Sequence, residues 1–241
     1  MEAPVTSFRH PHFLIARQPT FDMPPPSTIF GHVASALGEL PSRDSFRFAY
    51  HFESEARASD LEHQHVVFAQ GGTFEFEGKK YPKNIQGNIQ PQFRDFHFRA
   101  RLTLYIDRLD WADAFRRPAF CVILGRSQDL ADVVTVETIT IEERSGAYLQ
   151  GTLLPFSMRH FTAQGSTAMM PRFISAPPER RADFARYVVL RDQLFCGAVE
   201  GSVTASLKYL DESQHTWLVD PDTRTVRGVQ RGLIFHAFTG D

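Results

Sequence analysis

The chain has 241 residues, 42% of them hydrophobic, and a formal net charge of −2 at pH 7. That length is enough for one large domain or two small ones that share a core, and the low net charge argues against a uniformly basic coat for nucleic acid. The longest apolar run, at about 119–124, is far shorter than the roughly 18 residues of a membrane-spanning helix. We therefore expect no membrane partner, and two distant cysteines without an apolar leader fit a reduced, cytoplasmic protein.

The chain is predicted to begin with a strand over residues 5–16, followed by a helix. Three consecutive prolines at 24–26 fix φ, so the helix cannot begin before Pro26. Ser27 or Thr28 is expected to act as its N-cap, and the helix should run to about residue 40. Its buried face is predicted from apolar residues at helical spacing, which are Ile29, Val33, Ala36 and Leu37.

A strand and a long hairpin are predicted next. Residues 46–52 alternate between aromatic and smaller or polar side chains, which is typical of a half-buried antiparallel strand. Residues 66–98 contain two adjacent glycines and a Gly-Lys-Lys turn, and are predicted to form a projecting hairpin. Residues 96–107 then alternate again. One face of that strand should be buried and the other, with His97, Arg99 and Arg101, should be basic.

The remaining pattern sets the expected fold class. Residues 111–117 predict a short helix, and the apolar run 119–124 predicts a central strand covered on both faces. The order strand, helix, strand, hairpin, strand, helix, strand is that of a ferredoxin-like (RRM-type) α+β domain. We expect this domain to span 1–129, with the hairpin as a protruding thumb at 66–98.

A smaller β-rich subdomain is expected at 130–241. Residues 159–192 are rich in arginine and proline and are interpreted as a loop followed by a short helix. The strands of this part are expected near 133–141, 147–155, 201–210 and 216–238.

Charge is distributed unevenly along the chain. Residues 79–101 contain six cationic side chains against a single carboxylate, whereas carboxylates outnumber cations in 192–241. Basic grooves that follow phosphates, together with aromatic side chains that stack on bases, are typical of single-stranded RNA recognition. The basic stretch therefore supplies the first RNA-binding candidates, which are Lys79, Lys80, Lys83, Arg94, Arg99 and Arg101.

Three sets of motifs carry a family resemblance. The first comprises residues 7–11 (SFRHP), 24–32 (PPPSTIFGH) and 35–38 (SALG); the others are 124–130 (LGRSQDL) and 231–236 (RGLIFH). Together they resemble the fifth Cas protein family, the subunit of type I CRISPR Cascade complexes that holds the 5′ handle of the guide RNA. The opening motif looks closest to a type I-B-like subtype.

The resemblance implies a noncatalytic crRNA-binding subunit for antiviral defence. It would cap the 5′ handle, contact the Cascade backbone subunit through the hairpin and support the Cascade large subunit that recognises target DNA. The family's glycine-arginine-serine loop corresponds to Arg126, Ser127 and Gln128, which we expect to contact the handle. Further candidates lie on the first strand, the helix start and the second strand, and are Arg9, His10, Arg17, Ser27, Thr28 and Arg47.

Two alternatives remain open. One branch of the family is a metal-independent endoribonuclease that processes pre-crRNA repeats with a Tyr and an adjacent Lys-His pair. This chain has no Lys-His dipeptide, so Tyr50, His51 or His97 would have to serve. A generic RRM-like RNA binder outside CRISPR systems is the other alternative. We expect no cofactor and no metal, because the histidine pair at 63 and 65 has no cysteines beside it.

Overall fold

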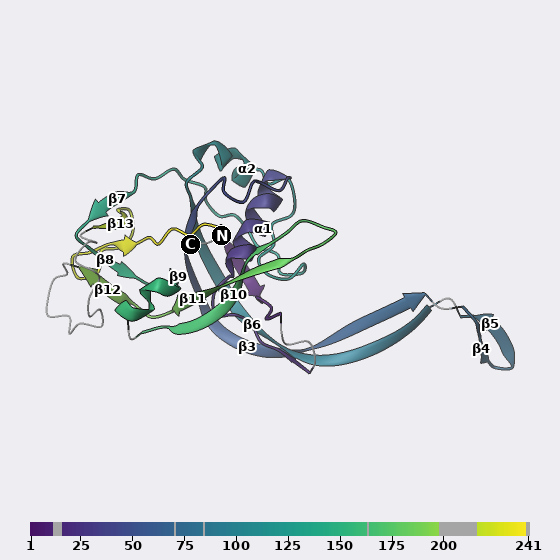
Figure 1. The fold of residues 1–241 in the computed structure, drawn as a ribbon. Coiled ribbons are helices and arrows are strands. Elements are labelled where there is room, and N and C mark those ends of the chain that lie inside the picture. Colours follow the sequence, from purple (N-terminus) through teal and green to yellow (C-terminus); the bar gives the residue numbers. More distant parts are fainter. Residues whose placement is uncertain (12–15, 70, 84, 163, 198–215, 240–241) are drawn as a thin grey trace.

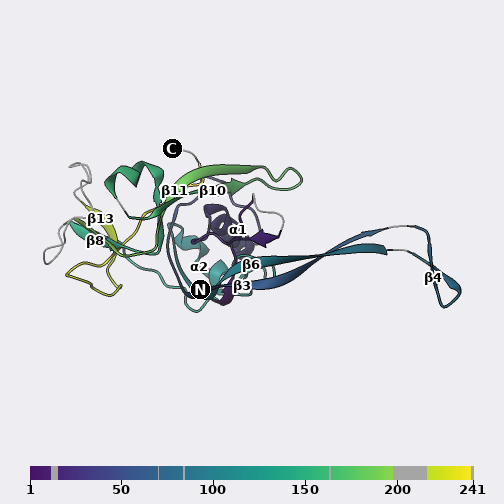
Figure 2. The ribbon, with the colours of Figure 1, turned by 90° about the horizontal axis from the view of Figure 1, so that it is seen from below.

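The computed structural model describes residues 1–11, 16–69, 71–83, 85–162, 164–197 and 216–239. Strands dominate it, with a few helices, so the chain is a mainly β protein compatible with the α+β class. A body made of several sheets carries one long hairpin that projects away from it (Figures 1 and 2). No helix in the described ranges is both long and apolar enough to cross a membrane.

The hairpin is formed by β3 (Phe48–Ala69) and β6 (Ile85–Ile106), which have 22 residues each. They pair antiparallel from Phe48 opposite Ile106 to Ala69 opposite Ile85. A small ribbon of β4 (Thr73–Phe76) and β5 (Lys79–Pro82) forms the tip. The predicted hairpin is confirmed but its arms are longer than 66–98, because the strands predicted at 46–52 and 96–107 are its root.

The root of the hairpin belongs to a four-stranded sheet in which β1 (Glu2–Thr6) and β2 (Arg17–Gln18) also pair with β6. Helix α1 (Pro26–Leu37) packs on this sheet, so that Ile29 and Val33 join Phe48 and Leu102 in the main core. The same core includes Leu153 and Phe238. The proposed division at residue 129 therefore does not coincide with a gap in the core.

Helix α1 begins at Pro26, the earliest position that the prolines allow, but neither Ser27 nor Thr28 is the N-cap. The cap is Pro25, which makes no side-chain hydrogen bond. Proline suits the first helical position because its fixed φ is helical and it has no N–H to leave unpaired. The helix ends at Leu37, three residues earlier than predicted, and is capped by Gly38, whose φ is 82°.

The alternating burial predicted for the hairpin root is found only in part. Phe46, Phe48 and Tyr50 are buried as predicted, but Ala49 and His51 on the opposite face are buried as well. In the second arm Ala100 and Leu102 are buried. Arg99 has a φ of 48°, and on its other side His97 is buried while Phe98 is exposed. The predicted basic face is thus interrupted, because the positive φ at Arg99 reverses which side chains of β6 point toward the core.

The predicted central strand at 119–124 is wrong. Phe120 is 63% exposed, and the segment forms no strand beyond an isolated bridge at Ile123. Instead, the N–H of Ala119 donates to the carbonyl of Ala36 at the end of α1 (3.0 Å). On the side of β1 that faces away from β6, the described chain forms only an isolated bridge between Glu2 and Asp132. A short 3₁₀ turn (Leu109–Trp111) and α2 (Ala112–Arg116) precede this segment and confirm the predicted helix.

The C-terminal half is β-rich as predicted, but its elements differ. Residues 133–141 form no strand, and 159–192 contains a β-hairpin, because its prolines lie at a register irregularity and in the connecting turn. The expected strand at 201–210 lies outside the described residues. One sheet has the order β10 (Ser166–Ile174), β11 (Ala182–Leu190), β9 (Thr152–Pro155). The other has the order β12 (Leu194–Gly197), β8 (Gly146–Leu149), β14 (Arg231–Gly232), β13 (Trp217–Asp220), β7 (Glu142–Arg144).

Alanine substitution should have opposite effects on stability at two glycines, one inside α1 and one at its C-cap. A Cβ at Gly38 would lie 2.9 Å from that of Ala119, and its φ is positive, so Gly38→Ala should lower the free energy of unfolding by about 1–2 kcal/mol. Gly31 has nothing within 4 Å, so Gly31→Ala should raise it by up to about 1 kcal/mol. Urea unfolding of both variants checks this, and equal shifts would contradict the C-cap geometry.

Candidate nucleic-acid interface

The loop that carries the Gly-Arg-Ser motif is fixed against the first strand. Gly125 has a φ of 106°, and a Cβ there would lie 2.7 Å from the Ser7 carbonyl oxygen, so only glycine fits. The buried carboxylate of Asp129 accepts from the Ser7 N–H (3.0 Å) and from the Arg126 backbone N–H (3.0 Å). The Arg126 guanidinium also donates to it (2.8 Å). The motif therefore has a structural role as a turn held by one carboxylate.

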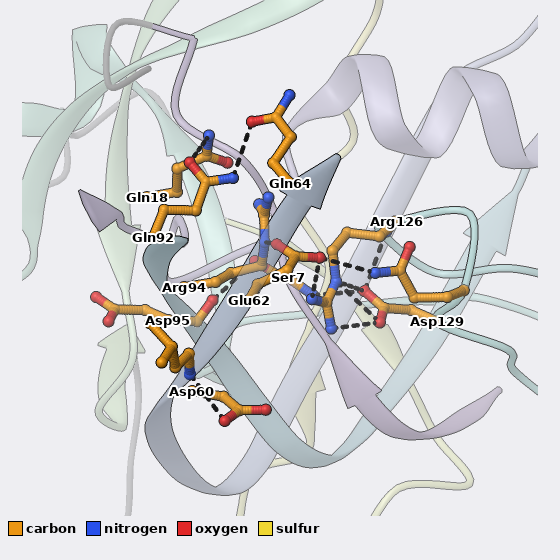
Figure 3. A network of polar contacts seen from close by, with 12 residues as sticks. Ser7, Gln18, Asp60, Glu62, Gln64, Gln92, Arg94, Asp95, Arg126 and Asp129 are labelled. Carbon is orange, nitrogen blue, oxygen red and sulfur yellow. Dashed lines mark hydrogen bonds and ion pairs between the residues drawn. The ribbon is translucent and has the colours of Figure 1, made fainter. Parts of the chain in front are cut away.

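Glu62, in the middle of β3, joins this loop to the hairpin (Figure 3). It accepts from the guanidinium of Arg94 on the opposite arm. The amide of Gln128 donates to it (3.1 Å), and the Arg126 guanidinium lies 3.6 Å away. Both arms of the hairpin are thus tied to loop 125–129 through a single carboxylate.

Two further chains of contacts complete this network. The amide of Gln18 on β2 donates to Gln92 (2.9 Å), which donates in turn to Gln64 on β3 (3.1 Å). The Ser7 hydroxyl donates to the carbonyl of Asp95 (2.8 Å), and Arg17 lies 3.3 Å from the Asp95 carboxylate. We call the contacts of loop 125–129, Glu62 and these residues the root network.

The proline loop packs on the hairpin root. The Tyr50 hydroxyl donates to the carbonyl of Pro24 (3.0 Å), and a ring nitrogen of His97 lies 2.9 Å from the carbonyl oxygen of Phe21. Arg57 binds the carboxylate of Asp22 and the carbonyl of Thr20. The signature residues before α1 therefore hold the root from the proline-loop side.

Most of the predicted cationic contacts are already compensated by carboxylates. Antiparallel pairing places the acidic residues of β3 beside the arginines of β6, and this cross-strand effect was not part of the charge count along the chain. Those of the pairs that are exposed contribute little to stability, but every pair lowers the local positive potential. The pairs are Arg17–Asp95, Arg47–Asp107, Arg94–Glu62, Arg99–Glu55, Arg101–Glu2 and Arg126–Asp129.

The hairpin tip is different. Lys79 and Lys80 lie exposed on β5, Lys83 is half-buried, and none of these lysines has an ion pair within the described part of the chain. Phe74 and Tyr81 stack across the two tip strands with ring centroids 5.6 Å apart, and they are 50% and 41% exposed. Phe76 is 59% exposed. The tip thus combines exposed aromatic rings with lysines that form no ion pair, although Lys80 is directly opposite Glu75.

The other predicted binding residues are scattered. Arg9 is exposed, and His10 stacks on Phe21 with centroids 3.6 Å apart. Ser27 and Thr28 are half-buried in the first turn of α1, and Ser127 is exposed in its loop. The root network brings Arg17, Arg94, Arg126 and Gln128 together, but not Arg47 or the tip lysines.

The residues considered for cleavage are buried. Burial raises the pKa of the Tyr50 hydroxyl well above its usual value and lowers the pKa of His51 and of His97. His51 contacts the carbonyl of Gln150 (2.8 Å) and the carboxylate of Glu53 (3.5 Å). His97 also contacts the hydroxyl of Ser54 (3.1 Å). Both histidines line one cavity of about 200 Å³.

Sequence reasoning missed the carboxylates that organise the root network. Asp129 follows the Gly-Arg-Ser motif directly, but Glu62 lies in a segment with no motif. Extending the hairpin predicted at 66–98 back toward the strand predicted at 46–52 places the acidic residues of 53–62 opposite the basic strand. The position of the turn at Gly78 in the sequence is enough to derive this cross-strand pairing.

The fold and these contacts define a strand-rich protein with a braced, projecting hairpin. The family model described as CRISPR-associated protein (Cas_Cas5) matches residues 1–194, and the chain belongs to this family. The resemblance of the sequence motifs is thereby confirmed.

Several solved structures are similar to the chain. One is from a "CRISPR RNA-guided surveillance complex", with 14% identity, 85% of this chain and 93% of that chain covered, and a TM-score of 0.48. Another is from the type III-B Cmr-beta complex bound to cognate target RNA and AMPPnP, with 12% identity, coverage of 81% and 84%, and a TM-score of 0.42. Among curated proteins, none matches the sequence.

Removing the Asp129 carboxylate should be costly, because it leaves the Ser7 and Arg126 donors without an acceptor. We expect Asp129→Ala to lower the free energy of unfolding by about 3 kcal/mol. Ser127→Ala in the same loop, where the side chain is exposed, should change it by less than about 0.5 kcal/mol. Urea denaturation measures both, and a similar loss in the two variants would contradict the structural role of Asp129.

Buried His97 predicts a pH dependence of stability. Its pKa is lowered in the folded protein, so the unfolded chain takes up a proton first as the pH falls below 6.5. Stability should then fall with pH, by up to about 1.4 kcal/mol per pH unit from this residue. His97→Gln should flatten the curve of unfolding free energy against pH, whereas His65→Gln on the exposed arm should leave it unchanged. Parallel curves for all three proteins would refute the assignment.

Proposed function

We propose that this chain is a noncatalytic crRNA-binding subunit of a type I CRISPR Cascade effector complex. In this proposal it caps the 5′ handle of the guide RNA and links the backbone subunit to the large subunit, and so takes part indirectly in recognising target DNA. The observation that carries the proposal is the hairpin, whose tip presents Phe74, Phe76 and Tyr81 beside Lys79 and Lys80.

The tip supplies the two kinds of group that single-stranded RNA requires. Exposed aromatic rings offer surfaces on which bases stack, at roughly 1–3 kcal/mol per base, and lysines bind phosphates. An isolated two-stranded ribbon is only marginally stable in water. A ribbon of this length, with exposed aromatic residues at its end, is therefore suited to a partner that covers it.

The hairpin arms support a protein contact as well. Alternation places Leu61, Val67, Ile89 and Phe93 on one face, because Leu61 pairs directly with Phe93 and side chains two positions apart share a face. All four side chains are exposed. We assign this apolar face to the neighbouring backbone subunit. The root network would hold the arms in a fixed direction, and we assign Arg126, Ser127 and Gln128 to the handle.

The endoribonuclease alternative is less well supported. His51 and His97 share a cavity, which is the one observation in its favour. A general acid or base needs a free imidazole nitrogen and a pKa near neutrality. The ring nitrogens of both histidines already have partners, and burial lowers both pKa values. A generic RNA binder outside CRISPR systems would need no neighbouring subunits.

The proposal also covers the fold of the N-terminal part, the domain division, the CRISPR subtype and the cellular location. We propose that β1, α1, β3, β6 and α2 form a ferredoxin-like core whose fourth strand is replaced by the irregular segment 119–132. The division into 1–129 and 130–241, a type I-B-like subtype and a cytoplasmic location belong to the same proposal. The subtype rests on the opening motif, the division on the β-rich sequence that begins near residue 130, and the location on the two distant cysteines.

Charge reversal at the tip tests RNA binding. Replacing Lys79, Lys80 and Lys83 by Glu in the assembled complex should weaken guide-RNA retention by about tenfold or more. It should also reduce the log–log salt slope by about 2, since each lost phosphate contact on a single strand contributes roughly 0.7. The matched control reverses Arg117, Arg180 and Arg224, which are exposed on the body.

Unchanged retention in the lysine variant, or an equal loss in the control, would count against the tip. End-labelled repeat RNA incubated with the chain in EDTA and run on a denaturing gel separates the alternatives. Intact but bound RNA is expected. A discrete cut that disappears in Tyr50→Phe, His51→Ala or His97→Ala would establish the ribonuclease instead.

A further inference from the structure

One edge of the hairpin root has no strand beside it. β1 pairs with β6 only as far as Glu2 opposite Arg101, and the N–H of Leu102 then donates to the carbonyl of Met1 (2.9 Å). Backbone groups of alternate residues point to the same side of a strand. The N–H and C=O of Leu104 and Ile106 therefore point to this same side, where the described chain provides no strand.

Residues 133–141 face this edge. Their sequence is strongly strand-like, yet they form no strand. Eight of these nine residues are β-branched, with Glu137 as the exception. None of their backbone groups bonds to another backbone group of the described chain, and only the Val136 carbonyl accepts a side-chain bond, from Arg116 (3.4 Å). In Figure 1 the segment is the plain coil that leads into β7.

The space between these two edges is a groove. Two adjacent cavities of about 150 and 290 Å³ share Leu102, Leu104 and Ile106 of β6 on one side and Thr135, Glu137 and Thr138 on the other. Val136 and Ile139 add apolar lining. A groove bordered by unpaired backbone donors and acceptors, with apolar walls, suits an extended peptide better than a helix or a small molecule.

The charge of the groove indicates what the peptide carries. Of its charged side chains, Asp107 pairs with Arg47, Arg108 pairs with Asp110, and Asp220 accepts from Tyr105 (2.7 Å). Glu137 lines both cavities and has no ion pair or hydrogen bond within the described chain. Because Glu137 is exposed at the rim of the groove and unpaired, its carboxylate is available to a lysine or arginine of a strand that enters the groove.

We propose that this groove binds an extended strand of another protein chain. The strand pairs with the free edge of β6 at Leu104 and Ile106 and with 133–141, places apolar side chains at alternate positions against the groove wall, and directs a lysine or arginine to Glu137. The inference does not depend on RNA binding, because it involves neither the hairpin tip nor loop 125–129.

A capped nine-residue peptide that alternates valine with lysine is the direct probe. In the full chain we expect the amides of 104, 106 and 133–141 to exchange rapidly with deuterium, and to become protected when the peptide is added. The same peptide with alternate backbone nitrogens methylated keeps its side chains but loses donors, and should not bind. Rapid exchange that persists with peptide, or equal binding of the methylated peptide, would overturn strand pairing.

The charge assignment has its own variant. Glu137→Lys should weaken peptide binding by about tenfold or more, as for a charge pair inside an interface. Glu39→Lys, an exposed charge reversal outside the groove, should leave binding unchanged. Unaltered affinity in Glu137→Lys would refute the contact. Self-association of the chain at micromolar concentration that Glu137→Lys abolishes would show that the groove binds a second copy instead.

Discussion

The continuous antiparallel pairing of β3 with β6 is the constraint on which the other features depend. Near the body β6 is the central strand of a sheet on which α1 packs, with β3 on one side of it, and further out the two strands leave the core and become a ribbon. The same register sets carboxylates beside arginines and lets one glutamate, Glu62, reach a loop that is distant in sequence. A shift of the register by one residue would reverse every side chain on both faces. The packing of the core, the ion pairs between the arms and the contacts of Glu62 with loop 125–129 thus all follow from the register of β3 with β6.

The parts of the fold governed by local rules could be predicted from the sequence. The start of α1 follows from what proline does to the backbone, and the buried aromatics of the root follow from strand alternation. The inversion at Arg99 could not be anticipated, because a positive φ in a non-glycine residue has no local signal. Residues 119–124 and 133–141 have the composition of strands, yet composition cannot say whether a neighbouring strand is present.

The site illustrates the same division between local and long-range information. The motifs select loop 124–130 as a handle contact, and the structure gives its glycine and arginine a structural task. The cations of 79–101 looked like a uniform basic stretch. They fall into two groups, because those near the body form ion pairs, whereas Lys79, Lys80 and Lys83 at the tip form none within the described chain. Only the spatial pairing separates the two groups.

The position of Glu62 and Arg94 along the hairpin also governs how the molecule can open. Beyond this pair and the adjoining contacts of Gln92 with Gln18 and Gln64, the arms have little apolar packing, so the ribbon can fray from its free end without disturbing the body. Fraying that reaches Glu62 has to break contacts with both the opposite arm and loop 125–129. The pair therefore divides the hairpin into two parts. The strands of the outer part can separate and pair again, whereas the inner part unfolds only with the core.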